Sequence, residues 1–281
     1  MTEQVPETQE GGTWGSREAA AEWRRRAAIR AQVLGPATEM MLDLAKVGVG
    51  SRVLDVGAGT GDGTLVAAQR VGPSGRVLAT DIAASMLEIA AESARHTGLS
   101  NVDTRVVDAQ YLDLESNAFD AAVSRACLML IPDYQKALTQ IRRVLKPGGR
   151  FAALVWSTPD RCPYVSIPHA IALRVGRLTS PAPECFGEFR LGAPGVLEQA
   201  YRTAGFQEVT VHTVLTRRCF PSLAEAMQHA RGPLRLRELM VRLSDAEQEQ
   251  AWAEIERAFG QFVGPNGFES TCEQLIGVGT K

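Results

Sequence analysis

The sequence predicts an α/β protein: a seven-stranded, mostly parallel Rossmann-like sheet with helices on both faces, an antiparallel last strand and helical lid insertions. One observation behind this prediction is the strict alternation of strand-like and helix-like segments between residues 51 and 156, which is typical of a parallel sheet built from crossover units. The other is the segment VLDVGAGTG at 53–61, in which an apolar strand runs into a glycine-rich turn. Together they place a ligand-binding turn at the carboxyl end of the first strand.

The elements of this fold follow from the spacing of apolar residues and from turn residues. Five strands are predicted first: RVLDV (52–56), RVLATD (76–81), VDTRVVD (102–108), FDAAVSR (119–125) and RFAALVW (150–156). Crossover helices are predicted at 61–70, 84–96 and 134–145, and the turn KPGG at 146–149 ends the last of them. A helix at 196–204, a strand within 205–214 and a closing strand at 274–280 complete the sheet. Before the sheet, we expect one helix over 17–33 and a second that starts at Pro36 and ends near Gly48.

Composition excludes several classes of protein. The chain of 281 residues is 45% hydrophobic and 22% charged, as in an ordinary globular protein, and its net charge of −2 gives no positive field for nucleic acid or acidic lipid. The polar, acidic start MTEQVPETQEGG lacks the pattern of a secretory signal, and no apolar stretch reaches membrane-spanning length. We therefore expect a cytoplasmic protein without membrane insertion or a nucleic-acid partner. The five cysteines are scattered, so we expect reduced thiols and no metal site.

The turn after the first strand carries glycine at three alternate positions, Gly57, Gly59 and Gly61. Glycine permits a tight turn and lets the backbone lie against a ligand, because no Cβ is in the way. Asp62 stands where the dinucleotide fingerprint GxGxxG has its third glycine. The spacing therefore favours a ligand smaller than a dinucleotide.

Carboxylates end the second and third strands of the predicted sheet. Asp81 can accept hydrogen bonds from both hydroxyls of a ribose, although it could instead cap the helix at 84–96. Asp108 suits an exocyclic amine of adenine and the backbone N–H of Ala109 a ring nitrogen, although Asp108 could instead cap its own loop. We favour the ligand roles because ligands bind at the carboxyl ends of parallel strands.

The motifs VLDVGAGTGDGT, VLATDIAASMLEIA, VVDAQYLDL, FDAAVSRACLMLIPD and LKPGGRFAALVW occur in this order and at a characteristic spacing. In them the chain resembles the class I S-adenosylmethionine-dependent methyltransferases, in particular the ubiquinone/menaquinone-type group often labelled methyltransferase type 11. The resemblance covers nearly the whole chain. It implies S-adenosyl-L-methionine as the cofactor and S-adenosyl-L-homocysteine as the product.

The resemblance also implies a set of cofactor-binding residues. The methionine end would lie against Asp55, Gly57, Gly59, Thr60 and Gly61; the ribose against Asp81; the adenine against Ile82, Met86, Asp108, Ala109 and Gln110; and the space between sulfonium and acceptor against Ser124 and Arg125. Arg125 could equally form a salt bridge at the sheet edge. The fourth motif reads SRACLM, which lacks the Asn/Asp-Pro-Pro-aromatic tetrapeptide of amine-specific DNA methyltransferases, and no paired-glutamate loop of arginine methyltransferases is present. We therefore predict a small-molecule acceptor.

The segments outside the motifs complete the predicted domain organisation. In chain order we expect a disordered tail (1–15), N-terminal helices that cover the cofactor site (16–50), the cofactor-binding core (51–156), a lid insertion (157–193), more of the core (194–218), a helical insertion that caps the acceptor (219–271) and a closing strand (272–281). Trp14 and Trp23 would close over the cofactor or else join the first helix to the core.

An oxygen acceptor would need a base, whereas a carbon or nitrogen acceptor need not. His169 is the first candidate, with Tyr164 and Glu184 behind it, and Arg125 would line the reacting space; a core or surface position is the alternative for His169. Apolar residues of the two insertions favour a largely hydrophobic acceptor. They are Ile167, Ile171, Leu173, Met227, Leu239 and Met240.

Two other functions stay open. The chain could bind the cofactor on this fold without methylating, as a cyclase would, because function depends on the site and not on the fold. It could also be an NAD-dependent oxidoreductase, which the GxGxG spacing disfavours. The sequence does not separate a monomer from a homodimer.

Overall fold

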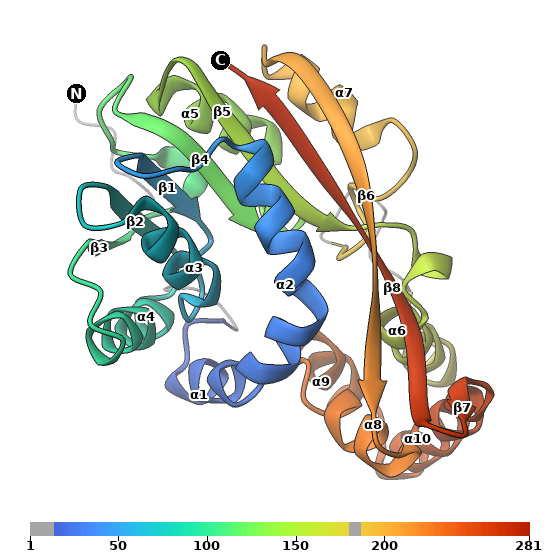
Figure 1. Ribbon diagram of the computed structural model, residues 1–281. Coiled ribbons are helices and arrows are strands. Elements are labelled where there is room, and N and C mark those ends of the chain that lie inside the picture. Colours follow the sequence, from blue (N-terminus) through green and yellow to red (C-terminus); the bar gives the residue numbers. More distant parts are fainter. Residues whose placement is uncertain (1–13, 180–186) are drawn as a thin grey trace, which may run out of the picture.

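The fold is seen in a computed structural model, which describes residues 14–179 and 187–281 (Figure 1). The predicted tail lies outside these ranges apart from its last two residues, and so do Glu184 and the surrounding part of the lid. None of the helices in the described ranges is long and apolar enough to cross a membrane.

One mixed sheet organises the chain. Its strands run in the order β3 (Val102–Val106), β2 (Arg76–Asp81), β1 (Arg52–Val56), β4 (Phe119–Arg125), β5 (Leu145–Trp156), β8 (Gly267–Thr280) and β6 (Gln207–Phe220). The first five are parallel, and β8 is antiparallel to both of its neighbours, β5 and β6. This confirms the predicted sheet, to which the two-residue strand β7 (Val263–Gly264) adds a short pairing with β8.

Alternate residues of the central strands are buried in opposite layers, because successive side chains of a strand point to opposite faces. In β1, Val53 packs with α2 (Ala27–Leu44) and α3 (Asp62–Val71), whereas Leu54 and Val56 pack with α5 (Tyr134–Val144) and α7 (Val196–Thr203). The helix α4 (Ala84–His96) contacts β2 and β3. Burial on both faces explains why these strands read as nearly continuous apolar runs.

The N-terminal helices differ from the prediction in where they break. The first, α1 (Arg17–Arg25), ends with Arg26 as its C-cap, and α2 then begins at once and continues through Pro36. A proline clashes with the Cβ of the residue before it, but that residue is Gly35, which has none. The carbonyl that Pro36 leaves without a helical partner belongs to Gln32, which is exposed, so water can hydrate it.

A separate cap forms beyond the carboxyl edge of the sheet, where Figure 1 shows α1 beside the cap helices. It contains α6 (Pro163–Val175), α8 (Leu223–Ala230), α9 (Leu234–Met240) and α10 (Asp245–Phe259). These pack around Tyr164, Phe220, Phe259 and Phe268. The last two strands enter this core, so β6 runs on to Phe220 and β8 begins at Gly267, well outside their predicted limits.

Candidate cofactor site

The glycine turn at the end of β1 has the backbone conformation that its sequence predicts. Gly57, Gly59 and Gly61 all have positive φ, of 71°, 55° and 86°. A Cβ on Gly57 would lie 2.1 Å from Sγ of Cys127, and one on Gly61 would lie 2.8 Å from Cβ of Ala90. Side chains other than hydrogen are therefore excluded by conformation and by space. At Gly59 a Cβ would meet only the Trp23 ring, with Nε1 at 3.4 Å and Cδ1 at 3.9 Å, so this part of the turn borders open space beneath α1.

Asp81 joins the end of β2 to this turn. Its Oδ2 accepts a hydrogen bond of 2.9 Å from the Gly59 N–H, and its Oδ1 accepts one of 3.0 Å from the Ala83 N–H. Burial raises the pKa of Asp81, and the backbone N–H groups of Ala83, Gly59 and Ile82 oppose that shift. The N-cap residue of α4 is Ala83, so Asp81 is not the cap of that helix. Each carboxylate oxygen keeps a free lone pair that a ribose hydroxyl can use.

Asp108 is held by its neighbour Gln110. The Gln110 backbone N–H donates to Oδ1 at 2.8 Å, and its Nε2 donates to Oδ1 and Oδ2 at 3.0 and 2.8 Å. Asp108 thus caps the short 3₁₀ helix Ala109–Tyr111, which is the alternative that the sequence left open. Recognition of adenine by Asp108 and the buried Ala109 remains a prediction.

Asp55, one residue before the end of β1, is fully buried beside the turn. The Thr64 hydroxyl donates to its Oδ2 at 2.6 Å, and the Thr80 hydroxyl donates to its backbone carbonyl at 2.9 Å. Burial raises the pKa of Asp55 to about 6, against the opposing effects of Thr64 and Arg125. A cation bound nearby would stabilise the ionised carboxylate.

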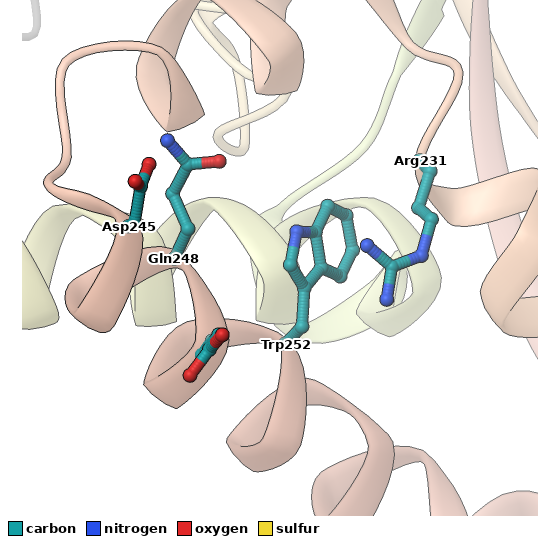
Figure 2. A pocket seen from close by; sticks show the side chains of 5 residues that line it. Arg231, Asp245, Gln248 and Trp252 are labelled. Carbon is teal, nitrogen blue, oxygen red and sulfur yellow. The ribbon is translucent and has the colours of Figure 1, made fainter.

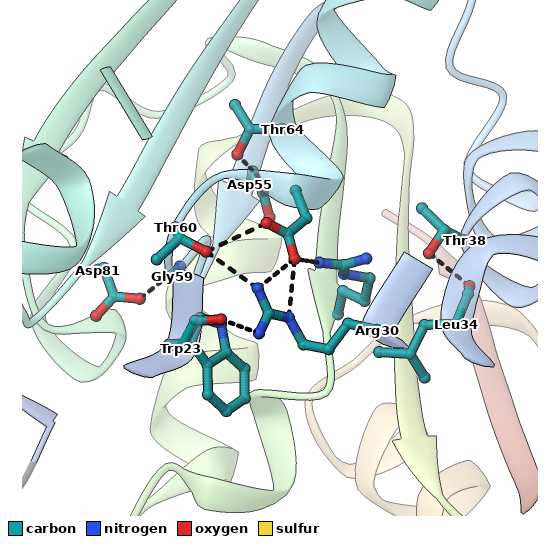
Figure 3. Close-up of polar contacts among 11 residues, drawn as sticks. Trp23, Arg30, Leu34, Thr38, Asp55, Gly59, Thr60, Thr64 and Asp81 are labelled. Carbon is teal, nitrogen blue, oxygen red and sulfur yellow. Dashed lines mark hydrogen bonds and ion pairs between the residues drawn. The ribbon is translucent and has the colours of Figure 1, made fainter. Parts of the chain in front are cut away.

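An ion cluster that the sequence analysis missed links α2, the glycine turn and β4 (Figure 3). Arg30 contacts Oδ2 of Asp62 through Nη2 at 2.6 Å and Nε at 2.8 Å, and Arg125 reaches the same oxygen at 3.3 Å. Arg30 also donates to the Thr60 hydroxyl at 3.3 Å and to the Trp23 carbonyl. Arg125 is thus in the salt bridge proposed as its alternative role. The sequence carries no local signal for this cluster, because Arg30, Asp62 and Arg125 are far apart in the chain.

The first helix closes over the end of β2. Trp23 and Trp14 meet edge to face with 5.3 Å between ring centroids, and both pack against the small buried cluster of Ala20, Ala83 and Met86. The Ser85 hydroxyl donates to the Gly15 carbonyl at 3.0 Å, which fixes the chain before α1. Both predicted roles of the tryptophans are compatible with this placement. Ile82, in contrast, is 46% exposed.

Two neighbours in the fourth motif also border the site. Ala126 has a φ of 56°, which is uncommon outside glycine and turns the chain so that Cys127 lies against Gly57. Burial raises the pKa of the Cys127 thiol, and the carboxylates of Asp81, Asp55 and Asp108 raise it further, so the thiol stays protonated. Ser124 is buried, and its hydroxyl has no hydrogen-bond partner in the described part of the chain.

The candidate bases lie in the lid helix α6. Tyr164 is in the aromatic core of the cap, where its hydroxyl donates to the Ala226 carbonyl at 2.8 Å and burial raises its pKa to about 12. These surroundings fit a structural residue better than a base. His169 contacts the Val165 carbonyl through Nδ1 at 2.8 Å, and its Nε2 lies 3.8 Å from Glu188. A neutral His169 then has its lone pair on Nε2.

A cavity of about 480 Å³ lies on the outside of the cap (Figure 2). The guanidinium of Arg231 covers the ring of Trp252 at 4.1 Å, beside Asp245, Gln248 and Glu249. No residue of the sheet lines this cavity, so we do not assign it to the cofactor or the acceptor.

The fold and the site define a class I methyltransferase with S-adenosylmethionine as its cofactor. The protein-family model described as "Methyltransferase domain" matches residues 48–166 of this chain. The ubiquinone/menaquinone biosynthesis C-methyltransferase of Pasteurella multocida is 33% identical over 183 residues, which are 62% of this chain and 68% of that protein. The chain therefore belongs to the family of S-adenosylmethionine-dependent methyltransferases and is an enzyme of that class.

Other relatives match over a smaller part. A demethylmenaquinone methyltransferase of Listeria monocytogenes is 35% identical over 119 residues, which are 42% of this chain and 50% of that protein. Among solved structures, phosphoethanolamine N-methyltransferase 2 of Haemonchus contortus, in complex with S-adenosyl-L-methionine, is similar with a TM-score of 0.61 and 18% identity. That likeness covers 98% of this chain and 60% of the other, and it concerns the fold alone.

Replacing Asp81 with alanine is expected to weaken binding of S-adenosylhomocysteine by about 1.5 to 3 kcal/mol, because a charged acceptor of hydrogen bonds is lost. The substitution also leaves the Gly59 N–H without its acceptor, because it donates to Asp81 Oδ2 at 2.9 Å. Calorimetry on the purified variant measures the change. Asp103→Ala is the matched control, because Asp103 lies on the adjacent strand and forms only an exposed pair with Arg76. Equal affinities for the two variants would show that the ribose does not bind at Asp81.

Proposed function

We propose that this enzyme transfers the methyl group to a small, largely hydrophobic molecule that binds between the carboxyl edge of the sheet and the cap. The observation that carries the proposal is the apolar core of the cap, which packs against the N-terminal helices at the edge where the glycine turn lies. A roof of this kind favours a small acceptor over a macromolecule, because the cap and the N-terminal helices cover the edge at which the acceptor must meet the cofactor. Whether oxygen, nitrogen or carbon is methylated stays open.

Contacts between the cap and the N-terminal helices support this arrangement. Ile29 of α2 packs on the cap core together with Ile167 and Ile171 of α6. Arg237 of α9 reaches Glu18 of α1 at 3.3 Å. We propose on these grounds that residues 16–50, 219–271 and the described parts of the lid, 157–179 and 187–193, cover the site, and that the rest of the described chain holds the cofactor.

The residues of the site fit the cofactor, since a Cβ at Gly59 would fill the space beside the turn that the cofactor needs. S-adenosylmethionine supplies a methyl group already activated by a sulfonium. The chain's own task is then to orient the acceptor and to exclude water, and orientation alone can contribute roughly 7 to 11 kcal/mol. Asp81 and the turn hold one end of the site, α1 covers it with Trp23, and His169 is the proposed base for an oxygen acceptor.

The buried carboxyl of Asp55 should make cofactor binding depend on pH. Its pKa of about 6 lies above the ordinary value, so the free protein holds a proton there at pH 5 and has lost it at pH 7. If the positively charged end of S-adenosylmethionine binds beside the ionised form, the proton must leave on binding below pH 6. We expect affinity to rise from pH 5 to pH 7 and to level off above it.

Calorimetry in buffers of different ionisation enthalpy checks this by counting the protons released at each pH. The variant Asp55→Asn cannot titrate and serves as the control, with an affinity independent of pH over this range. Proton release from Asp55→Asn equal to that from the parent would assign the titration to another group.

The acceptor class is tested by giving the purified enzyme methyl-labelled S-adenosylmethionine and a cell extract. We expect label in low-molecular-mass, solvent-extractable products identified by mass spectrometry. Label confined to protein or nucleic acid would overturn the proposal. Consumption of an extract compound without transfer of label, while S-adenosylhomocysteine still binds, would indicate the non-methylating, cyclase-like alternative. The family assignment leaves the NAD-dependent oxidoreductase without support.

A further inference from the structure

Two arginines contact neighbouring residues of the cap, one turn of helix away from the ion cluster at the glycine turn: Arg218 lies over Tyr164, Arg26 donates to the His229 carbonyl, and both Tyr164 and His229 stack on Phe220. Arg26 occupies the break between α1 and α2, and Arg218 lies on β6 where this strand enters the cap. The guanidinium of Arg218 covers the ring of Tyr164 with 4.6 Å between Cζ and the ring centroid. Both guanidinium groups lower the pKa of the buried Tyr164 hydroxyl, against the larger effect of its burial, and Arg218 lowers the pKa of Arg26.

Arg218 is incompletely paired. It makes no ion pair with any residue in the described ranges, and its Nε is buried without a hydrogen-bond partner there. A buried guanidinium N–H without an acceptor costs free energy, because it has given up water and gained nothing in return. Such a group calls for a partner, which can be water, an ion or a bound ligand.

The positive charge of Arg26 is only weakly compensated by its surroundings. Its Nη2 donates to the His229 carbonyl, and within the described part of the chain its one carboxylate partner is Glu22, at 4.0 Å from Nε. Burial lowers the pKa of Arg26, and Arg218 lowers it further, against the opposing effect of Tyr164. His229 adds no positive charge of its own, because burial, Arg26 and Arg218 lower its pKa and favour its neutral form. Among the described residues, Arg26 therefore has one carboxylate partner, which also pairs with Arg25, and Arg218 has none.

The position of the pair suits an acceptor and not the cofactor. Arg26 precedes Arg30 by four residues, and Arg30 contacts Thr60 and Asp62 of the glycine turn. Residues four apart on a helix are neighbours, so the pair lies about 5–6 Å further from the turn, toward the cap. Aromatic rings flank it there: Tyr164 stacks on Phe220 with 5.6 Å between centroids, and Phe220 stacks on His229 at 5.0 Å.

We propose that the methyl acceptor carries an anionic group, a carboxylate or a comparable oxyanion, which Arg218 and Arg26 bind while the apolar part of the molecule lies along the cap. This inference rests on the proposed function and narrows it to amphiphilic acids. A role for Arg26 in capping α8 accounts for its bond to His229, but it does not account for the unpaired Nε of Arg218.

The experiment compares matched acid and amide probes on enzyme saturated with S-adenosylhomocysteine. The probes are benzoate with benzamide and 2-naphthoate with 2-naphthamide, and their affinities are measured by calorimetry. The parent should bind the acid of at least one pair about tenfold more tightly than its amide, and Arg218→Met should bring this ratio close to one. Arg218→Lys keeps the charge and should restore part of the preference.

Arg217→Met is the matched control, because Arg217 is the adjacent residue of β6 and is exposed in a pair with Glu269 at 2.6 Å. It should keep the preference of the parent. If Arg218→Met does not fold, Arg26→Met is used in its place and should reduce the ratio as well. No preference for acids in the parent, including no binding of any probe, overturns the inference, as does an unchanged ratio in Arg218→Met. Binding of S-adenosylhomocysteine is measured first, so failure of the cofactor site is recognised separately.

Discussion

Replacing Asp62 with alanine is expected to lower the free energy of unfolding by about 3 kcal/mol, a fall in Tm of roughly 6–12 °C. One oxygen of this carboxylate binds both Arg30 and Arg125, whose side chains are only 10% and 11% exposed. Removing it leaves two buried positive charges next to each other without a shared partner. The remaining exposure admits some water, which is why we take the lower end of the range known for broken buried pairs.

Thermal and denaturant unfolding measure this effect, with Asp43→Ala as the control. Asp43 also binds an arginine, Arg70 at 2.5 Å, but its side chain is 70% exposed, so its loss should change stability by less than about 1 kcal/mol. Asp62→Asn, which keeps one acceptor oxygen, should lie between the two. Equal stability of Asp62→Ala and Asp43→Ala would mean that the cluster around Arg30 does not hold α2 on the glycine turn.

The central sheet could be predicted because its signals are local. Each buried strand is a short apolar run bounded by turn residues, and each crossover helix has its own apolar spacing. The glycine turn is equally local, since Gly57 and Gly61 are required by the backbone of their own loop. The identity of the cofactor could be predicted from these residues and from the family resemblance that they carry.

The parts that could not be predicted depend on contacts between distant segments. Arg30 and Asp62 are 32 residues apart, and no spacing in the sequence joins them. The usual rule that proline starts a helix placed a boundary at Pro36, whereas Gly35 before it lets α2 continue. Residue type alone could not place Tyr164 either: a tyrosine in a lid suits acid–base chemistry, and nothing in the sequence shows that it is buried among Phe220, Phe259 and Phe268.

Gly59→Val is expected to weaken binding of S-adenosylhomocysteine by at least about 100-fold while the protein stays folded, which corresponds to roughly 2.7 kcal/mol. Gly59 has a φ of 55°, where a branched side chain is strained by about 1–2 kcal/mol. Its Cβ would already lie 3.4 Å from Nε1 of Trp23, so the two methyl groups of valine must enter the space between the turn and α1. We place the methionine end of the cofactor in that space.

Gly98→Val is the control that separates steric blocking of the cofactor site from backbone strain. Gly98 also has a positive φ, of 70°, but no atom lies within 4 Å of an added Cβ. Both variants should lose a similar amount of stability in thermal unfolding, since both force valine into the left-handed region. Only Gly59→Val should lose affinity in calorimetry, because only there does the side chain occupy the site. If the two variants bind S-adenosylhomocysteine equally well, the space under Trp23 is not where the cofactor lies, and the roof formed by α1 must serve the acceptor alone.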